Sequence, residues 1–139
     1  MPIKQYIVAI RQAAESKTPL PIRGGGSKAF YGNPLADGKH AVLDTTTYSG
    51  IVEYEPTELV VTARAGTRLA DLEAALNQQG QMLAFEPPYF GENATLGGCV
   101  ATGLSGPRRV AAGSVRDFVL GVRMLDGKGD DLRFGGQVM

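Results

Sequence analysis

Two glycine-rich segments, far apart in the chain, contain the residues best suited to ligand chemistry. Residues 95–103 read Thr-Leu-Gly-Gly-Cys-Val-Ala-Thr-Gly, and residues 23–27 read Arg-Gly-Gly-Gly-Ser. Glycine allows the backbone to approach a ligand closely, and successive N–H groups in such a loop form a concavity that favours an anion. Two loops of this kind predict a site for a ligand that contains a diphosphate group.

Each glycine segment also has a plainer interpretation. A short helix beginning near Gly98 would offer N–H groups to a phosphate, and its later small residues would pack against a sheet. Gly24–Gly26, taken alone, is more typical of a plain flexible turn. Together with Ala29 it also matches the dinucleotide fingerprint of NAD-binding folds. That fingerprint requires a long helix, which the Gly-Asn-Pro sequence at residues 32–34 would break.

Composition excludes several function classes. The 139 residues include 14 Lys or Arg and 14 Asp or Glu. The chain therefore lacks the net positive charge that would favour nucleic acid as a partner. With a single histidine, His40, and a single cysteine, Cys99, we expect no structural zinc site and no histidine-assisted nucleophile. The lone cysteine and the absence of a signal-peptide pattern favour the cytoplasm.

Hydrophobic spacing predicts the elements that position the two loops. An amphipathic helix opened by Pro2 should end at Thr18-Pro19, and a second helix capped by Thr67 should close at Gly80. A turn at residues 126–129, Asp-Gly-Lys-Gly, predicts a hairpin between the last two strands. The expected strands are residues 20–23, 41–44, 50–54, 59–65, 118–125 and 130–134.

Four blocks of sequence, residues 21–27, 55–67, 95–103 and 113–121, occur in an order that identifies a family. Over essentially its whole length, the chain resembles the FAD-binding domain of the vanillyl-alcohol oxidase and p-cresol methylhydroxylase flavoproteins. The resemblance implies an α+β fold of two α/β lobes, residues 1–56 and 57–139. The second lobe would be mostly antiparallel and incomplete, and FAD would lie extended between the two lobes.

The resemblance also implies a cofactor-binding set and no catalytic or metal-binding residue. Members that attach flavin covalently use a histidine at the position of Ser27. Serine cannot form that bond, so non-covalent FAD is implied. The implied cofactor-binding residues are Arg23, Gly24, Gly25, Gly26, Ser27, Thr95, Leu96, Gly97, Gly98, Thr102, Gly103, Ser114 and Asp117.

Weaker matches at residues 27–30, 80–83, 86–88 and 105–109 resemble the FAD-binding subunits of bacterial glycolate oxidases. They imply oxidation of a 2-hydroxy acid to a 2-oxo acid. The implied partners are a second FAD subunit and an iron–sulfur subunit, which leave peripheral attachment to the inner membrane open.

Chains of this family continue into more of the second lobe and a substrate-binding cap. The given sequence stops before both. We expect their absence to leave an unpaired strand edge near Leu132–Phe134, which promotes self-association. The alternative function is a non-catalytic structural or assembly fragment that binds flavin weakly or not at all.

Overall fold

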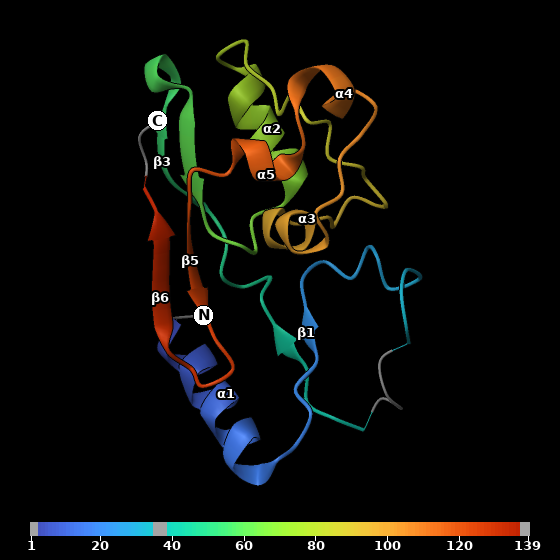
Figure 1. The fold of residues 1–139 in the computed structure, drawn as a ribbon, viewed down its shortest axis with the longest axis vertical. Coiled ribbons are helices and arrows are strands. Elements are labelled where there is room, and N and C mark those ends of the chain that lie inside the picture. Colours follow the sequence, from blue (N-terminus) through green and yellow to red (C-terminus); the bar gives the residue numbers. More distant parts are fainter. Residues whose placement is uncertain (1–2, 35–38, 137–139) are drawn as a thin grey trace.

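The computed structural model describes residues 3–34 and 39–136, and it combines short helices with small sheets (Figure 1). The expected start of the first helix at Pro2 lies outside the described residues. The helices are α1 (Ile3–Ser16), α2 (Leu69–Asn77), α3 (Leu96–Thr102), α4 (Arg109–Ala112), α5 (Val115–Phe118) and the 3-10 turn η1 (Pro56–Glu58). The strands are β1 (Ile22–Arg23), β2 (Leu43–Asp44), β3 (Ile51–Glu55), β4 (Val60–Ala63), β5 (Gly121–Leu125) and β6 (Asp131–Gly135).

The strands form three pairs. β1 and β2 are parallel, whereas β3–β4 and β5–β6 are antiparallel hairpins. The β5–β6 register places Val122 opposite Phe134 and Met124 opposite Leu132, so these four side chains share one face. The β3–β4 hairpin crosses residue 56, so the two expected lobes share a sheet there, and their division at this residue stays a prediction.

Helix α1 lies beside the turn of the β5–β6 hairpin (Figure 1). Its Arg11 forms an ion pair with Asp130 at 3.7 Å and donates a hydrogen bond to the Lys128 carbonyl. On another side of α1, the buried Tyr6 ring meets the edge of Tyr48 at 6.2 Å between centroids. α1 therefore joins the hairpin to the segment that follows β2.

The hydrophobic core lies among α2, α3 and α5. Leu69 is fully buried, and Phe85, Cys99 and Val115 are each less than 5% exposed in the same cluster. In the described part of the chain before residue 64, Tyr6 is the only buried hydrophobic side chain. The core therefore stabilises one part of the molecule much more than the other.

Two helix starts differ in detail from the sequence-based prediction. Thr67 does not cap α2: the N-cap position is Arg68, and the Thr67 hydroxyl bonds to the backbone of Gly50 instead. Helix α3 begins at Leu96 rather than near Gly98, because Thr95 accepts a hydrogen bond from the Gly98 N–H and caps it. Gly80, with φ of +65°, follows the end of α2 as expected.

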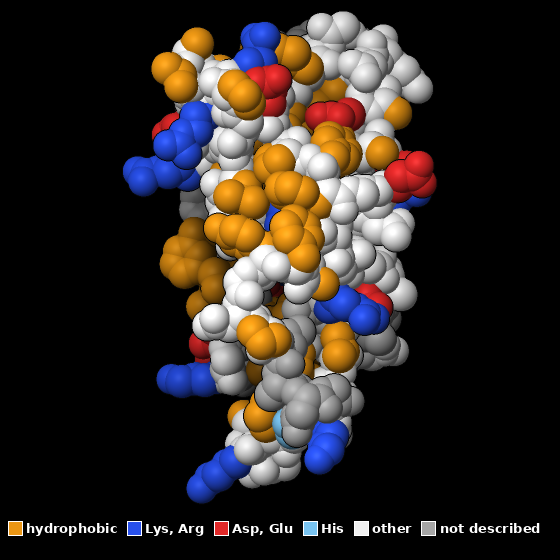
Figure 2. Space-filling view, turned by 90° about the vertical axis from the view of Figure 1, so that its right-hand side faces the viewer, with side chains coloured by type: hydrophobic (Ala, Val, Ile, Leu, Met, Phe, Trp, Pro, Cys, Tyr) orange, Lys and Arg blue, Asp and Glu red, His pale blue; other side chains and the backbone are white. Residues whose placement is uncertain are grey.

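The molecule exposes more surface than its mass requires. Its accessible area is 9290 Å², whereas a compact monomer of 14.7 kDa would expose about 6,900 Å². On the apolar face of the hairpin, Phe134 is 54% exposed and Met124 is 44% exposed. Hydrophobic side chains also gather in the middle of the face shown in Figure 2. Such surfaces are typical of regions that other polypeptide covers.

Gly66 tests the packing between the β4–α2 turn and the segment after β2. A Cβ atom at this position would lie 2.2 Å from the Thr45 carbonyl oxygen and 2.7 Å from that of Tyr48. We expect Gly66→Ala to lower the free energy of unfolding by about 2–4 kcal/mol, because backbone would have to shift. Urea denaturation measures this loss. Gly127→Ala is the control, since a Cβ there meets no atom within 4 Å, and an equal effect of both substitutions would contradict the prediction.

Candidate functional site

The two glycine segments meet in the structure. A Cβ on Gly25 would lie 1.5 Å from the carbonyl oxygen of Asn93, and a Cβ on Gly24 would lie 2.6 Å from the Thr95 hydroxyl oxygen. No side chain fits at either contact, so only glycine permits the first loop to reach the start of the second. The predicted convergence of these remote segments is therefore present in the fold.

A third segment holds the second loop in place. The Leu96 N–H donates to the Thr67 carbonyl and the Gly97 N–H to the Ala65 carbonyl, both at 2.8 Å. Arg68 forms a β-bridge with Thr95. Gly97 also packs closely, since a Cβ there would lie 2.8 Å from that of Ala65. The turn between β4 and α2 is thus bound along the edge of the second loop.

These contacts remove one physical reason for expecting a ligand at the start of α3, namely free backbone N–H groups. The N–H groups of Leu96, Gly97 and Gly98 donate to the Thr67 carbonyl, the Ala65 carbonyl and the Thr95 hydroxyl. The start of α3 therefore does not offer the free amides that the sequence predicted. A cofactor-binding role for these three residues stays a prediction that rests on the family resemblance.

The first loop, in contrast, has backbone N–H groups that are not used within the described fold. Gly24 and Gly25 are partly buried, and the N–H groups of residues 24–27 make no hydrogen bond with any residue that the structure describes. Partly buried backbone donors require an acceptor from water or a ligand. This loop is therefore the segment that fits an anion through its main chain.

The three segments surround a hollow of about 760 Å³. Of the predicted residues, Arg23, Gly24, Gly25, Gly26 and Thr95 line it, whereas Ser27 is not part of its wall. Their role in cofactor binding stays a prediction. The glycine of the Ala65-Gly66-Thr67 block is the one sequence signal that indicates a close backbone approach among the other lining residues, none of which was predicted to bind the cofactor. These are Asp44, Thr46, Ser49, Gly50, Ile51, Gly66, Thr67, Arg68, Asp71 and Asn93.

The charges on the wall are balanced in two pairs. Arg68 binds Asp71 through two hydrogen bonds of 2.9 and 2.7 Å, and Arg23 approaches Asp44 at 3.5 Å. Hydrogen bonding from Arg68 lowers the pKa of Asp71. The lowered pKa of Asp44 comes mainly from the Thr46 hydroxyl and N–H, with a smaller contribution from Arg23. Both carboxylates are therefore ionised at neutral pH.

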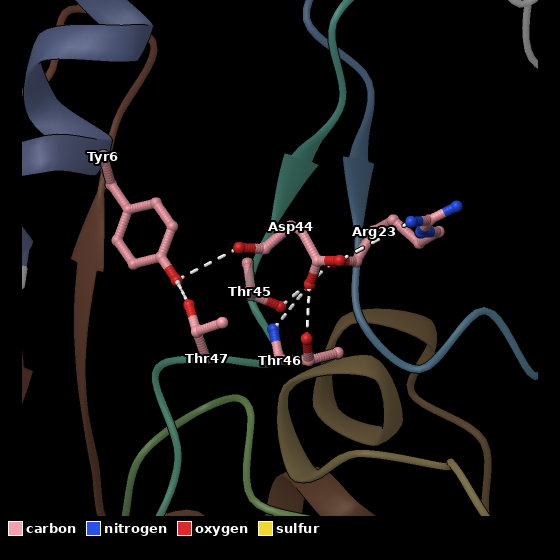
Figure 3. Close-up of polar contacts among 6 residues, drawn as sticks. All are labelled: Tyr6, Arg23, Asp44, Thr45, Thr46 and Thr47. Atoms are coloured by element: carbon pink, nitrogen blue, oxygen red, sulfur yellow. Dashed lines mark hydrogen bonds and ion pairs between the residues drawn. The ribbon is translucent and has the colours of Figure 1, made fainter. Parts of the chain in front are cut away.

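Asp44 also organises the end of β2 (Figure 3). One carboxylate oxygen accepts from the Thr46 N–H at 2.8 Å and from the Thr46 hydroxyl at 2.6 Å. The Tyr6 hydroxyl donates to the Asp44 carbonyl at 3.1 Å, and the Thr45 N–H donates to the Arg23 carbonyl. These bonds fix the wall of the hollow to α1 and to β1.

The remaining predicted residues gather at the other end of α3. A second hollow of about 700 Å³ is lined by Gly103, Ser114 and Asp117, together with Val100, Arg109, Gly113, Val115, Arg116 and Val119. The Asp117 carboxylate accepts from the Ser114 N–H at 2.8 Å and from its hydroxyl at 3.0 Å. The Thr102 hydroxyl bonds back to the Gly98 carbonyl within α3. Five of the thirteen predicted residues thus line the first hollow and three line the second, whereas Ser27, Leu96, Gly97, Gly98 and Thr102 line neither.

Other site types find no support in the described residues. Within residues 3–34 and 39–136, no group of three or more potential metal-binding side chains occurs. The helices of this part of the chain are all too short or too polar to cross a membrane.

The fold and the paired glycine segments define a dinucleotide-binding domain of flavoproteins. The family model for the FAD binding domain matches residues 3–135, and the chain belongs to this family. The predictions of an α+β FAD-binding fold and of FAD as cofactor are confirmed. The N–H groups of residues 24–27, which bond to no described residue and lie on the loop that lines the hollow, fit the diphosphate of that cofactor.

Known proteins of this kind are considerably longer. The chain is 58% identical to glycolate oxidase subunit GlcE of Escherichia coli K12, over 94% of this chain and 36% of that protein. It is 28% identical to a D-lactate dehydrogenase of Anaerostipes hadrus, covering 97% of this chain and 28% of that one. The solved structure of alkyldihydroxyacetonephosphate synthase matches its fold with a TM-score of 0.70 and 20% identity, over 95% of this chain and 25% of the other. The chain thus spans about a third of the length of these curated relatives.

Thr67 lines the hollow and bonds to Gly50, the residue that precedes β3. Its hydroxyl accepts from the Gly50 N–H at 2.9 Å and can donate to the Gly50 carbonyl at 3.2 Å, and the residue is 3% exposed. We expect Thr67→Val to lower the free energy of unfolding by about 1–3 kcal/mol, because the Gly50 N–H loses its acceptor, whereas the Gly50 carbonyl keeps the Arg64 N–H as a donor. Thr67→Ser keeps the hydroxyl and should cost about 1 kcal/mol or less. Denaturant unfolding compares the two, and a valine variant as stable as the serine variant would contradict this role.

Proposed function

We propose that this chain is the FAD-binding part of a flavin-dependent oxidoreductase that oxidises a 2-hydroxy acid, such as glycolate, to a 2-oxo acid. The observation that carries the proposal is the meeting of Gly24 and Gly25 with Thr95 and Asn93 around one hollow, with open main-chain donors on the first loop. The 58% identity to a glycolate oxidase subunit supports the substrate class.

The first loop would hold the diphosphate of FAD through the N–H groups of residues 24–27. Hydrogen bonds from neutral donors to a charged oxygen contribute about 1.5–3 kcal/mol each. Gly103, Ser114 and Asp117 would contact another part of the dinucleotide, because their hollow lies at the far end of α3. Ser27 would leave the flavin unattached, since it has no imidazole.

The chemistry follows from the cofactor and not from a side chain of this site. Oxidation of a 2-hydroxy acid releases a hydride from carbon and a proton from the hydroxyl group, and bound FAD supplies the hydride acceptor. The residues described here bind and orient the dinucleotide. We assign no catalytic role to any of them.

Gly25→Ala tests the cofactor site. The new Cβ would require the first loop to move away from the Asn93 carbonyl, which lies 1.5 Å from the Cβ position. We expect affinity for FAD to fall at least about tenfold, because the N–H groups no longer converge. Quenching of flavin fluorescence measures the dissociation constant, and circular dichroism reports whether the fold is kept.

Gly127→Ala is again the matched control for that experiment, because its Cβ position is open. A folded Gly25→Ala variant with wild-type affinity would contradict the cofactor site. A wild-type protein that takes up no FAD would favour the alternative, a structural or assembly module.

The proposal includes partner subunits. The relatives GlcE of Escherichia coli and GlcD of Bacillus subtilis are both named as glycolate oxidase subunits. We infer that this chain works beside a second FAD subunit and an iron–sulfur subunit in the cytoplasm, with attachment to the inner membrane through those partners. The excess accessible surface and the exposed apolar face of β5–β6 support contact with other chains.

The exposed hairpin face predicts self-association of the isolated chain. We expect sedimentation velocity to show concentration-dependent dimers or larger species, and Phe134→Ser to shift the equilibrium towards monomer about tenfold, because this 54% exposed ring would lie in the interface. Val110→Ser is the control, since Val110 on α4 is 93% exposed and lies away from the hairpin. A wild-type monomer at high concentration would overturn the prediction.

A further inference from the structure

Arg68 lines the same hollow as the Gly24–Gly26 loop, but from the segment between β4 and α2. We propose that Arg68 is a side-chain ligand for the diphosphate of the bound dinucleotide and supplements the main-chain donors of the first loop. This inference rests on the proposed function. Arg68 is not among the cofactor-binding residues that the family resemblance implies.

The backbone of Arg68 is fixed relative to both glycine loops. Arg68 pairs with Thr95 in a β-bridge, and its two neighbours bond to the same segment through Leu96 N–H to Thr67 carbonyl and Leu69 N–H to Ala94 carbonyl. Thr95 in turn lies against Gly24, where a Cβ would be 2.6 Å from its hydroxyl oxygen. The position of the Arg68 Cα is therefore set by the contacts that bring the two loops together.

The Arg68 guanidinium is oriented and still has donors available. Its Nε and Nη2 atoms bind the two carboxylate oxygens of Asp71 at 2.9 and 2.7 Å. Its Nη1 atom has no hydrogen-bond acceptor among the residues that the structure describes. Guanidinium has five N–H groups in a rigid plane, so a second anion can bind at the edge that Asp71 leaves open.

Arg68 suits this role better than Arg23, the other arginine of the hollow. Arg23 meets Asp44 through one contact of 3.5 Å, and its side chain folds back towards Gly26, where a Cβ would lie 3.7 Å from Arg23 Cδ. The two-point contact with Asp71 restricts Arg68 before the ligand arrives, which reduces the entropy lost on binding. The nearby carboxylates of Asp71 and Glu92 offset part of its charge, so the expected effect on affinity is moderate.

The test measures binding by the full chain of FAD, ADP and riboflavin, which differ in whether they contain a diphosphate. We expect Arg68→Ala to weaken FAD and ADP about 5- to 20-fold and to leave riboflavin unchanged, because a half-exposed arginine contributes less than a buried one. The variant should also reduce the salt dependence of FAD binding. If the alanine variant is unstable, Arg68→Gln takes its place, because it keeps a long polar side chain without the charge. It should weaken the binding of FAD and ADP to the same extent.

Arg64→Ala is the matched control four residues earlier. Arg64 donates to the Ser49 carbonyl at 3.1 Å, its Cζ lies over the Tyr48 ring at 5.4 Å from the centroid, and it is not part of the wall of the hollow. FAD affinity of Arg64→Ala should equal that of the wild type. Folded Arg68 variants that bind FAD and ADP like the wild type would overturn this inference and leave the proposed function intact. A wild-type chain that binds no FAD would instead overturn the proposed function.

Discussion

The structure depends on one contact, the approach of the Gly24–Gly25 backbone to Asn93 and Thr95. The distances there exclude any side chain, so the two loops can only meet if both positions lack a Cβ. The same constraint applies to the third segment, where Gly66 lies against the Thr45 and Tyr48 carbonyls. The hollow exists because these backbones pack without side chains between them.

The glycine loops have different tasks, although they look alike in the sequence. The amides at the start of α3 bond to the β4–α2 turn and hold the loop in place, whereas the amides of residues 24–27 are not used by the described part of the chain. The amides of one loop thus stabilise the fold, and those of the other are available to an acceptor from outside the chain. The charges around them are paired, so an anion would meet local donors rather than a strongly positive field.

Local patterns predicted the elements better than the contacts between them. The helix from residue 3 and the β5–β6 hairpin were expected, because periodicity and turn residues are local signals. The meeting of the glycine loops was the one tertiary contact expected, because both loops have the composition of an anion-binding turn. The role of Thr67 was predicted wrongly: its hydroxyl bonds to Gly50, a tertiary partner that spacing cannot indicate. Arg68 was missed for the same reason, since only the bridge to Thr95 places it on the wall of the hollow.

The uneven distribution of the core has a consequence for how the molecule responds to a ligand. The Leu69, Phe85 and Cys99 cluster stabilises the helical part, whereas the side chains of β1 are exposed and those of β2 are only partly buried. The hollow lies between these unequally stable parts. A molecule bound there adds its binding free energy to their docking, so loading with cofactor should also protect the amino-terminal segment from proteases.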